Sequence, residues 1–270
     1  MTYAVGIATP KRTVAGTYWS YEPTNPHGDD PGLAALDGVA TDAVVVDVGA
    51  HVGEYAIPLA RDTDREVIAF EPNPVSADRL ARNARRNDVS GTEGDGNGID
   101  IRRAGVGEAP ATLPFYRSTF SKCSAFDRDR ATRWSAVVAG VEQVPIRRLD
   151  DLVEGVAEAS GADESSGAAD AVTDGDPSPI PAPDAIKVDV EGRELAVLRG
   201  ACQTIETYRP LLVVEVHGAA DDGDGSEGGG DELGAAGETG EHVRAVREWL
   251  AERRYAVEPA GDVWICRPRS

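Results

Sequence analysis

Short apolar runs alternate along most of the chain with longer segments in which apolar residues recur at helical spacing. Runs rich in β-branched residues predict buried strands at 43–48, 66–70, 99–103, 185–190 and 211–216. The segments that predict helices are 53–61, 74–87, 193–207 and 241–253. Strands that alternate with helices pair in parallel through right-handed crossovers, with helices on the faces of the sheet.

Two parts of the chain depart from this alternation. Near the C-terminal end, 255–258 and 263–267 flank a turn and predict a β-hairpin, which adds one antiparallel strand to the sheet. Residues 105–151 contain two further predicted strands, 112–116 and 143–147, around the polar stretch 117–133. The pattern as a whole predicts an α/β fold with a mostly parallel sheet.

Two acidic segments interrupt the pattern. Residues 154–184 are rich in Ala, Gly, Ser and Pro, residues 219–241 are rich in Gly, and each segment contains eight acidic residues and no Lys or Arg. Such compositions bury too little apolar surface to offset chain entropy, so both predict loosely ordered loops. A shorter polar insert spans 90–98.

The charge of the chain is strongly acidic. Its 270 residues contain 27 basic and 47 acidic side chains, a net charge of −20, and most of the excess lies in the two acidic segments. An acidic chain argues against sequence-independent nucleic-acid binding and against docking on anionic lipid. Only three basic residues are Lys, and this depletion resembles haloarchaeal proteins adapted to concentrated salt, although a GC-rich genome gives the same bias.

The cysteines and the lengths of the apolar runs indicate the cellular compartment in which we expect the protein. The three cysteines are widely spaced without a Cys-x-x-Cys pair, so they indicate neither a zinc site nor a disulfide framework. A reducing cytoplasm is the expected setting. The sequence contains no run of 18 apolar residues, so we expect no stable membrane insertion. The oligomeric state is left open.

Ligands of open α/β sheets bind beyond the carboxyl ends of the strands, and the first two strand ends carry suitable residues. The loop 47–54 (DVGAHVGE) contains Gly-x-x-x-Gly, not the Gly-x-Gly-x-x-Gly of dinucleotide-binding proteins. Glu71 ends the second strand, where an acid can accept hydrogen bonds from ribose hydroxyls. The alternatives are an ordinary tight turn and a Glu71 that caps the next helix.

The last two parallel strands end in a cluster of ionisable residues. Alternation places Lys187, Asp189 and Glu191 on one face, and Glu215 and His217 on one face of the next strand. Buried strands do not carry such groups without a use. A Lys–acid pair and a structural histidine are the simpler explanations, but they do not account for the whole cluster.

These segments together resemble the FkbM family of S-adenosylmethionine-dependent methyltransferases. The matching pieces are 47–54 (DVGAHVGE), 69–74 (AFEPNP), 144–152 (VPIRRLDDL), 186–194 (IKVDVEGRE), 198–201 (LRGA) and 209–218 (RPLLVVEVHG). One departure is His51, where the family usually has Asn. The resemblance implies a Rossmann-like class I methyltransferase fold, with a seven-stranded sheet and an antiparallel C-terminal strand. We expect 41–270 to form the methyltransferase domain, with 1–40 as an N-terminal segment that is either a substrate-side cap or surface packing.

The resemblance also implies a cofactor, S-adenosylmethionine, and a set of residues that contact it. By similarity Asp47, Gly49 and Gly53 line its methionine part, Glu71 holds the ribose, and the residues after the third strand approach the adenine. The cofactor-binding residues expected on this basis are Asp47, Gly49, Ala50, Gly53, Glu71, Asn73 and Ala104.

The expected reaction is methylation of a hydroxyl on a glycan, lipid or small-molecule acceptor, which requires a base. The candidates are Asp189, Glu191, Glu215 and His217, with Asp189 or His217 as the base and Lys187 orienting Asp189. Magnesium bound by Asp189 and Glu215 is a further option. Nucleic-acid bases are not the expected acceptors, because the Asn/Asp-Pro-Pro-aromatic motif is absent. The alternative functions are a non-catalytic nucleotide-binding module and an NAD-dependent oxidoreductase.

Overall fold

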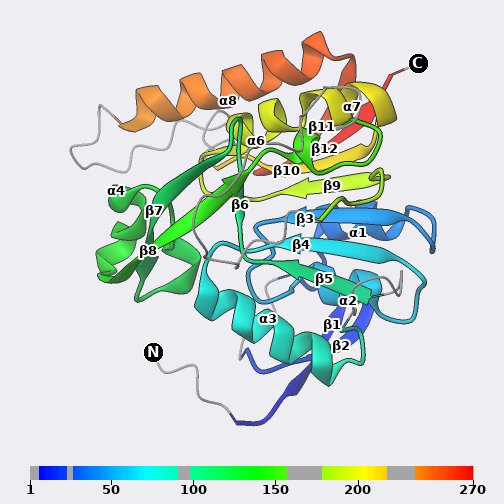
Figure 1. The fold of residues 1–270 in the computed structure, drawn as a ribbon, viewed down its shortest axis with the longest axis vertical. Coiled ribbons are helices and arrows are strands. Elements are labelled where there is room, and N and C mark those ends of the chain that lie inside the picture. Colours follow the sequence, from blue (N-terminus) through cyan, green and yellow to red (C-terminus); the bar gives the residue numbers. More distant parts are fainter. Residues whose placement is uncertain (1–5, 23–26, 91–97, 157–177, 218–234, 270) are drawn as a thin grey trace.

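A seven-stranded sheet forms the centre of the computed structural model, which describes residues 6–22, 27–90, 98–156, 178–217 and 235–269. Its strand order is β11-β12-β10-β9-β3-β4-β5 (Figure 1). The strands are β3 (Val44–Val48), β4 (Glu66–Phe70), β5 (Gly98–Arg102), β9 (Ala185–Val188), β10 (Leu211–Glu215), β11 (Tyr255–Ala260) and β12 (Val263–Pro268). Strand β12 is antiparallel to both of its neighbours, β10 and β11, whereas β3, β4, β5, β9 and β10 pair in parallel. This order and these directions confirm the predicted class I methyltransferase fold.

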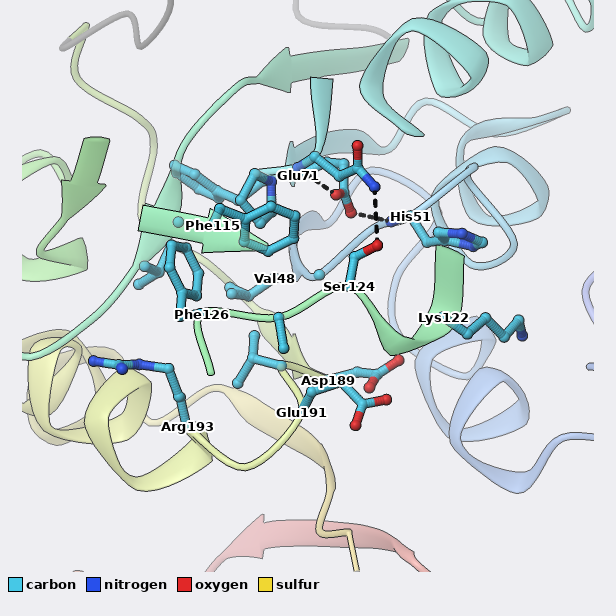
Figure 2. Close-up of a pocket in the computed structure, with 18 of the residues that line it drawn as sticks. Val48, His51, Glu71, Phe115, Lys122, Ser124, Phe126, Asp189, Glu191 and Arg193 are labelled. Carbon is cyan, nitrogen blue, oxygen red and sulfur yellow. Dashed lines mark hydrogen bonds between the residues drawn. The ribbon is translucent and has the colours of Figure 1, made fainter. Parts of the chain in front are cut away.

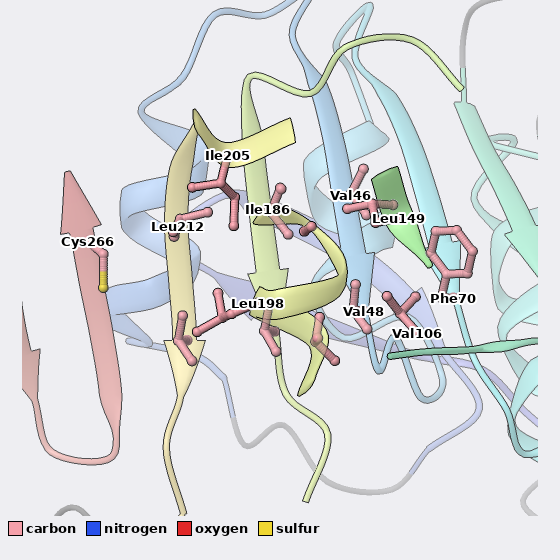
Figure 3. Packing of buried hydrophobic residues seen from close by; sticks show 14 of the residues in the cluster. Val46, Val48, Phe70, Val106, Leu149, Ile186, Leu198, Ile205, Leu212 and Cys266 are labelled. Carbon is pink, nitrogen blue, oxygen red and sulfur yellow. The ribbon is translucent and has the colours of Figure 1, made fainter. Parts of the chain in front are cut away.

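Helices cover both faces of the sheet. They are α1 (Pro31–Asp37), α2 (Ala56–Ala60), α3 (Pro74–Arg86), α6 (Glu194–Gly200), α7 (Cys202–Tyr208) and α8 (Ala235–Glu252). Successive strand residues point to opposite faces, so Val45 packs in a cluster with α1, α2 and α3, and Val46 packs in a second cluster with α6, α7 and α8. Figure 3 shows the second cluster, with Leu198 and Ile205 above the strands. Burial on both faces explains why these strands are apolar runs.

A small three-stranded sheet stands apart from the central one. Strand β8 (Val138–Arg147) pairs in parallel with β6 (Gly105–Val106) and antiparallel with β7 (Ala111–Ser118). The chain between β7 and β8 forms three short helices, η1 (Ser121–Cys123), α4 (Arg128–Ala131) and η2 (Arg133–Ser135), and a further one, η3 (Leu149–Asp151), follows β8. The predicted strands at 112–116 and 143–147 are parts of the long β7–β8 pair, which lies to one side of the central sheet (Figure 1).

The N-terminal segment forms a hairpin that packs on α3. Strands β1 (Thr9–Thr13) and β2 (Gly16–Ser20) pair antiparallel. The Arg82 guanidinium lies 3.8 Å from the centre of the Tyr21 ring, and the Asn87 side chain donates to the Trp19 carbonyl at 2.7 Å. These aromatic residues therefore cover α3. The assignment of 1–40 as a substrate-side cap remains a prediction.

Several predicted boundaries are wrong. Strand β9 ends at Val188, not at residue 190, and the helix expected at 53–61 begins only at Ala56. The helix expected at 193–207 is two helices that meet at Ala201. There Gly200 packs against the backbone of Gly107, where a Cβ on Gly200 would lie 1.9 Å from the carbonyl oxygen.

The ends of the two acidic segments also differ from the prediction. Helix α8 begins at Ala235, so the last residues of 219–241 are helical. At the end of 154–184, the Ile180 amide donates to the Leu152 carbonyl at 2.8 Å and its side chain is buried. The remainder, 157–177 and 218–234, lies outside the described residues, as does 91–97 of the third insert.

Candidate active site

A pocket lies at the carboxyl ends of the parallel strands. Its walls come from the ends of β3, β4, β9 and β10, from the residues after β5, and from the η1 segment between β7 and β8 (Figure 2). Of the predicted site residues, eight line this pocket: Gly49, Glu71, Asn73, Ala104, Asp189, Glu191, Glu215 and His217. Four do not line it: Asp47, Ala50, Gly53 and Lys187.

The structure brings the predicted ionisable residues of β9 and β10 together around one imidazole. The Nε2 atom of His217 lies 3.2 Å from a Glu191 carboxylate oxygen, 3.9 Å from Asp189 and 4.0 Å from Glu215. Burial lowers the pKa of His217, but the bonds to Glu191 and Glu194 outweigh burial and raise it to about 11. His217 is therefore an imidazolium at neutral pH, with no free lone pair to accept a proton.

A buried lysine lies beneath this cluster. The Nζ atom of Lys187 is 3.2 Å from Asp47 Oδ1 and 3.3 Å from Asp189 Oδ2, and it donates to the Gly49 carbonyl at 3.0 Å. Burial lowers the pKa of Lys187, but the carboxylates of Asp47, Asp189 and Glu215 raise it above its usual range. Asp47 therefore acts below the pocket floor as the counter-ion of Lys187, and Lys187 contacts Asp189 as predicted.

The two glycines of the 47–54 loop have different structural roles. Gly49 has a φ of 84°, and a Cβ there would lie 1.8 Å from the Asp189 carbonyl oxygen. Gly53 has a φ of 91°, and its Cβ would meet the buried side chains of Leu80 and Ile57. Gly49 thus lets the ends of β3 and β9 approach at the pocket, whereas Gly53 lets the loop pack on α3. His51 has a φ of 49°, a conformation that Asn adopts more readily than other residues with a side chain.

We predict that Gly49→Ala lowers the free energy of unfolding by about 2–3 kcal/mol, because strand β9 must move away. Gly261→Ala is a matched control, since Gly261 also has a positive φ (66°) but has nothing within 4 Å of its Cβ position. Urea unfolding of both variants checks this. Equal losses in the two would show that backbone strain, not the contact with Asp189, explains the need for glycine.

Glu71 and Asn73 organise the end of β4. The buried carboxylate of Glu71 accepts hydrogen bonds from the backbone amides of His51 and Asn73, both at 2.7 Å. Burial raises the pKa of Glu71, although His51 and these bonds oppose the shift. The Asn73 side chain caps α3 by accepting from the Val75 amide at 3.1 Å. Asn73, not Glu71, therefore caps the helix, which leaves Glu71 facing the pocket.

The pocket has an ionic end whose residues sequence reasoning missed. Glu54 lies 3.4 Å from His27 Nε2 and 3.2 Å from Lys122 Nζ. Burial raises the pKa of Glu54, but hydrogen bonds from His27 and His51 lower it well below its usual range. Glu54 stands in the 47–54 motif, where it could have been noticed. His27 and Lys122 stand in no motif, and only the fold brings them to this loop.

The opposite end of the pocket is apolar. Phe115 and Phe126 pack edge to face with ring centroids 4.9 Å apart, and Val48, Ala104 and Val106 complete the wall (Figure 2). A flat aromatic ligand fits this end, a diol suits the carboxylate of Glu71 between the two ends, and a zwitterion suits the ionic end.

The comparisons with known proteins agree with this geometry. Residues 170–257 match the family model described as the methyltransferase FkbM domain. This part of the chain is similar to the FkbM methyltransferases. The match confirms the resemblance seen in the sequence, and it includes the FkbM segment that contributes Asp189, Glu191, Glu215 and His217 to the pocket.

Two curated proteins that resemble the chain are named as methyltransferases. The hexuronic acid methyltransferase AglP of Haloferax volcanii is 28% identical over 188 residues, covering 69% of this chain and 61% of that protein. Methyltransferase sdnD of Sordaria araneosa is 27% identical over 193 residues, covering 62% of this chain and 66% of the relative. The matched region thus spans about three-fifths to two-thirds of these relatives.

Solved structures of methyltransferases also resemble the chain. The FkbM methyltransferase of Methylobacillus flagellatus is 17% identical with a TM-score of 0.44, covering 84% of this chain and 43% of that one. An O-methyltransferase from Bacillus cereus is 13% identical with a TM-score of 0.43, covering 90% and 83%. Among the described helices of the chain, none is long and apolar enough to cross a membrane.

Proposed function

We propose that this chain transfers the methyl group of S-adenosylmethionine to a hydroxyl oxygen of a glycan, lipid or small-molecule acceptor. The observation that carries the proposal is the juxtaposition of two features in one pocket. A compartment suited to an adenosine and an amino acid lies beside three carboxylates, those of Asp189, Glu191 and Glu215. A protein that only bound the cofactor would not require these three carboxylates.

The residues that would hold the cofactor follow from the three surfaces of the pocket. Phe115, Phe126 and Ala104 would contact the adenine, Glu71 the ribose, and Glu54 with Lys122 the charged amino-acid end. When bound, S-adenosylmethionine supplies a methyl group activated by a sulfonium. The protein has to bring the acceptor oxygen into line, exclude water and take up the proton that the hydroxyl loses.

Asp189 is the base that the electrostatics favour. Its side chain lines the pocket and is 28% exposed, so an acceptor can reach it. His217 was the other candidate, but the surrounding carboxylates hold it as an imidazolium. Glu191 is engaged by His217 at 3.2 Å and by Arg133 at 3.1 Å. In this arrangement Asp189 accepts the proton from the acceptor hydroxyl, and Lys187 compensates the charge of its carboxylate.

The same charges support a hydroxyl acceptor over a carboxylate acceptor. The name of the Haloferax relative pairs methyl transfer with a hexuronic acid, a sugar that carries both hydroxyl and carboxyl groups. An acceptor carboxylate placed beside Asp189, Glu191 and Glu215 would be repelled by like charges. A neutral hydroxyl avoids this repulsion and uses the base, so we propose a sugar hydroxyl as the preferred acceptor group.

Magnesium is not required by this proposal. Ligand atoms of Asp189, Glu215 and His217 lie within 4.8 Å of one another, so the group has the dimensions of a metal site. However, a protonated imidazole offers no lone pair, and Lys187 already provides a positive charge beside Asp189. Methyl transfer is therefore expected to continue in the presence of EDTA. If EDTA abolished the activity and added magnesium restored it, a metal ion and not Lys187 would be the cation that balances Asp189.

Two measurements test the proposed function. Calorimetric titration is expected to show binding of S-adenosylmethionine and none of NAD. Assays with methyl-labelled S-adenosylmethionine and methyl glycosides are expected to label a hydroxyl of the sugar. Binding of NAD without S-adenosylmethionine would favour the oxidoreductase. Binding of S-adenosylmethionine without transfer to any glycan, lipid or small-molecule hydroxyl would favour the non-catalytic module.

A further inference from the structure

Glu194 is a fully buried acid behind the pocket, and the mechanism proposed above does not use it. It is the first residue of α6, and its side chain has no solvent exposure. One carboxylate oxygen accepts from the Gly192 amide at 2.8 Å and contacts His217 Nδ1 at 3.3 Å. The other contacts His242 Nε2 at 2.5 Å. A buried carboxylate is costly unless it is paired and hydrogen-bonded, and here both of its oxygens are engaged.

The contact with Glu194 fixes the orientation of the His217 ring. An imidazole has two nitrogens on opposite sides, and a carboxylate that binds one of them sets the direction of the other. With Nδ1 held by Glu194, the Nε2 atom of His217 faces Glu191, Asp189 and Glu215. A 180° flip of the ring would place the carbon atoms Cδ2 and Cε1 where Nδ1 and Nε2 now lie, and would remove the contacts of His217 with Glu194 and Glu191.

His242 connects this arrangement to a distant part of the chain. It lies on α8, which packs on the far side of α6, and its contact occupies the Glu194 oxygen that His217 does not use. Each carboxylate oxygen of Glu194 therefore contacts one imidazole. His217 comes from the residues after β10, and His242 comes from α8, which precedes β11. The two partners restrict the carboxylate to one rotamer, since a rotation that kept either contact would break the other.

We propose that Glu194 is a positioning residue that sets the His217 ring, with His242 as the anchor of Glu194. The His217 cation, held in this orientation, keeps the carboxylates of Asp189, Glu191 and Glu215 at the spacing that presents Asp189 to the acceptor. The catalytic consequence rests on the proposed function. The positioning itself is a property of the protein without any ligand.

Kinetics of single and double variants test the catalytic part. Glu194→Gln is expected to lower kcat by about 10- to 100-fold, the range typical for groups that orient a functional histidine. The dissociation constant of S-adenosylmethionine should stay within about threefold, because Glu194 does not line the pocket. His217→Gln should lower kcat similarly, and the double variant should be no slower than His217→Gln alone. Independent, multiplicative losses would overturn the proposal.

A milder variant covers the case in which Glu194→Gln does not fold. His242→Leu removes only the anchor, because leucine has no group that can donate to Glu194, and it leaves the contact between Glu194 and His217 in place. It is expected to lower kcat by about three- to tenfold, less than the loss of Glu194 itself. Glu206→Gln is the matched control, since Glu206 lies on α7 with a side chain that is 54% exposed. A kcat of His242→Leu equal to that of the control would exclude the anchor role.

Nitrogen-15 NMR of histidine-labelled protein gives a readout that is independent of activity. The chain has four histidines, so the His217 ring signals can be assigned with His217→Gln. Glu194→Gln is expected to shift the Nδ1 signal of His217, whereas Glu206→Gln should leave it unchanged. An unchanged signal in Glu194→Gln would overturn the positioning role. A shifted signal in a protein without methyl transfer would overturn the proposed function alone.

Discussion

Asp189→Asn is expected to lower kcat for methyl transfer by about a thousandfold, within the range of a general base. Asparagine has nearly the same shape as aspartate but cannot take up the proton of the acceptor hydroxyl. The contact between Asp189 and Lys187 at 3.3 Å and the contact with His217 at 3.9 Å both lose their ionic character. The measurement is steady-state kinetics with the sugar acceptor identified for the wild type.

Binding measurements decide what a loss of activity in Asp189→Asn means. The affinity for S-adenosylmethionine should stay within about tenfold of the wild type, because the expected cofactor contacts remain. Asp62→Asn is the matched control, with a side chain that is 86% exposed. Activity within about threefold of the wild type would remove Asp189 from the role of base. Loss of cofactor binding would instead place Asp189 among the cofactor contacts.

Lys187→Met is expected to lower the free energy of unfolding by about 3–5 kcal/mol. Lys187 is almost completely buried, and so is Asp47, its partner at 3.2 Å. Methionine fills a similar volume but leaves the Asp47 carboxylate in the interior without a cation. The hydrogen bond from Lys187 to the Gly49 carbonyl is lost as well, so the loop that borders the pocket should loosen.

Two further variants identify the cause of the loss in Lys187→Met. Adding Asp47→Asn removes the unpaired charge and should restore at least half of the lost stability. Lys122→Met is the matched control, because Lys122 is 41% exposed and its ion pair with Glu54 should contribute less than about 1 kcal/mol. Urea unfolding measures all three proteins. A double variant as unstable as Lys187→Met would show that packing of the lysine chain, not charge pairing, explains the cost.

Local patterns were sufficient for the main elements of the fold. The run of β-branched residues in β3 and the Asn-Pro pair before α3 determine these elements within a few residues, so their prediction was accurate. The N-terminal hairpin was not predicted, because β1 and β2 are short and mostly exposed and gain their contacts from α3. Breaks such as the one at Ala201 depend on a neighbouring segment, in this case the backbone of Gly107.

Local sequence patterns were sufficient to show which functional groups lie at the strand ends. Positions at the ends of β9 and β10, or just beyond them, were enough to place four residues at one edge of the sheet: Asp189, Glu191, Glu215 and His217. These are consequences of local backbone geometry, which spans only a few residues.

The charge and orientation of these groups depend on the packing of segments that are remote in the sequence. His217 is a cation because Glu191 and Glu194 surround it, and its ring direction depends on Glu194 with His242, 48 residues away along the chain. Asp47 is a buried counter-ion because Lys187, 140 positions later in the sequence, lies on the adjacent strand. Charge state and orientation depend on distances between segments remote in sequence, and no local pattern specifies those distances.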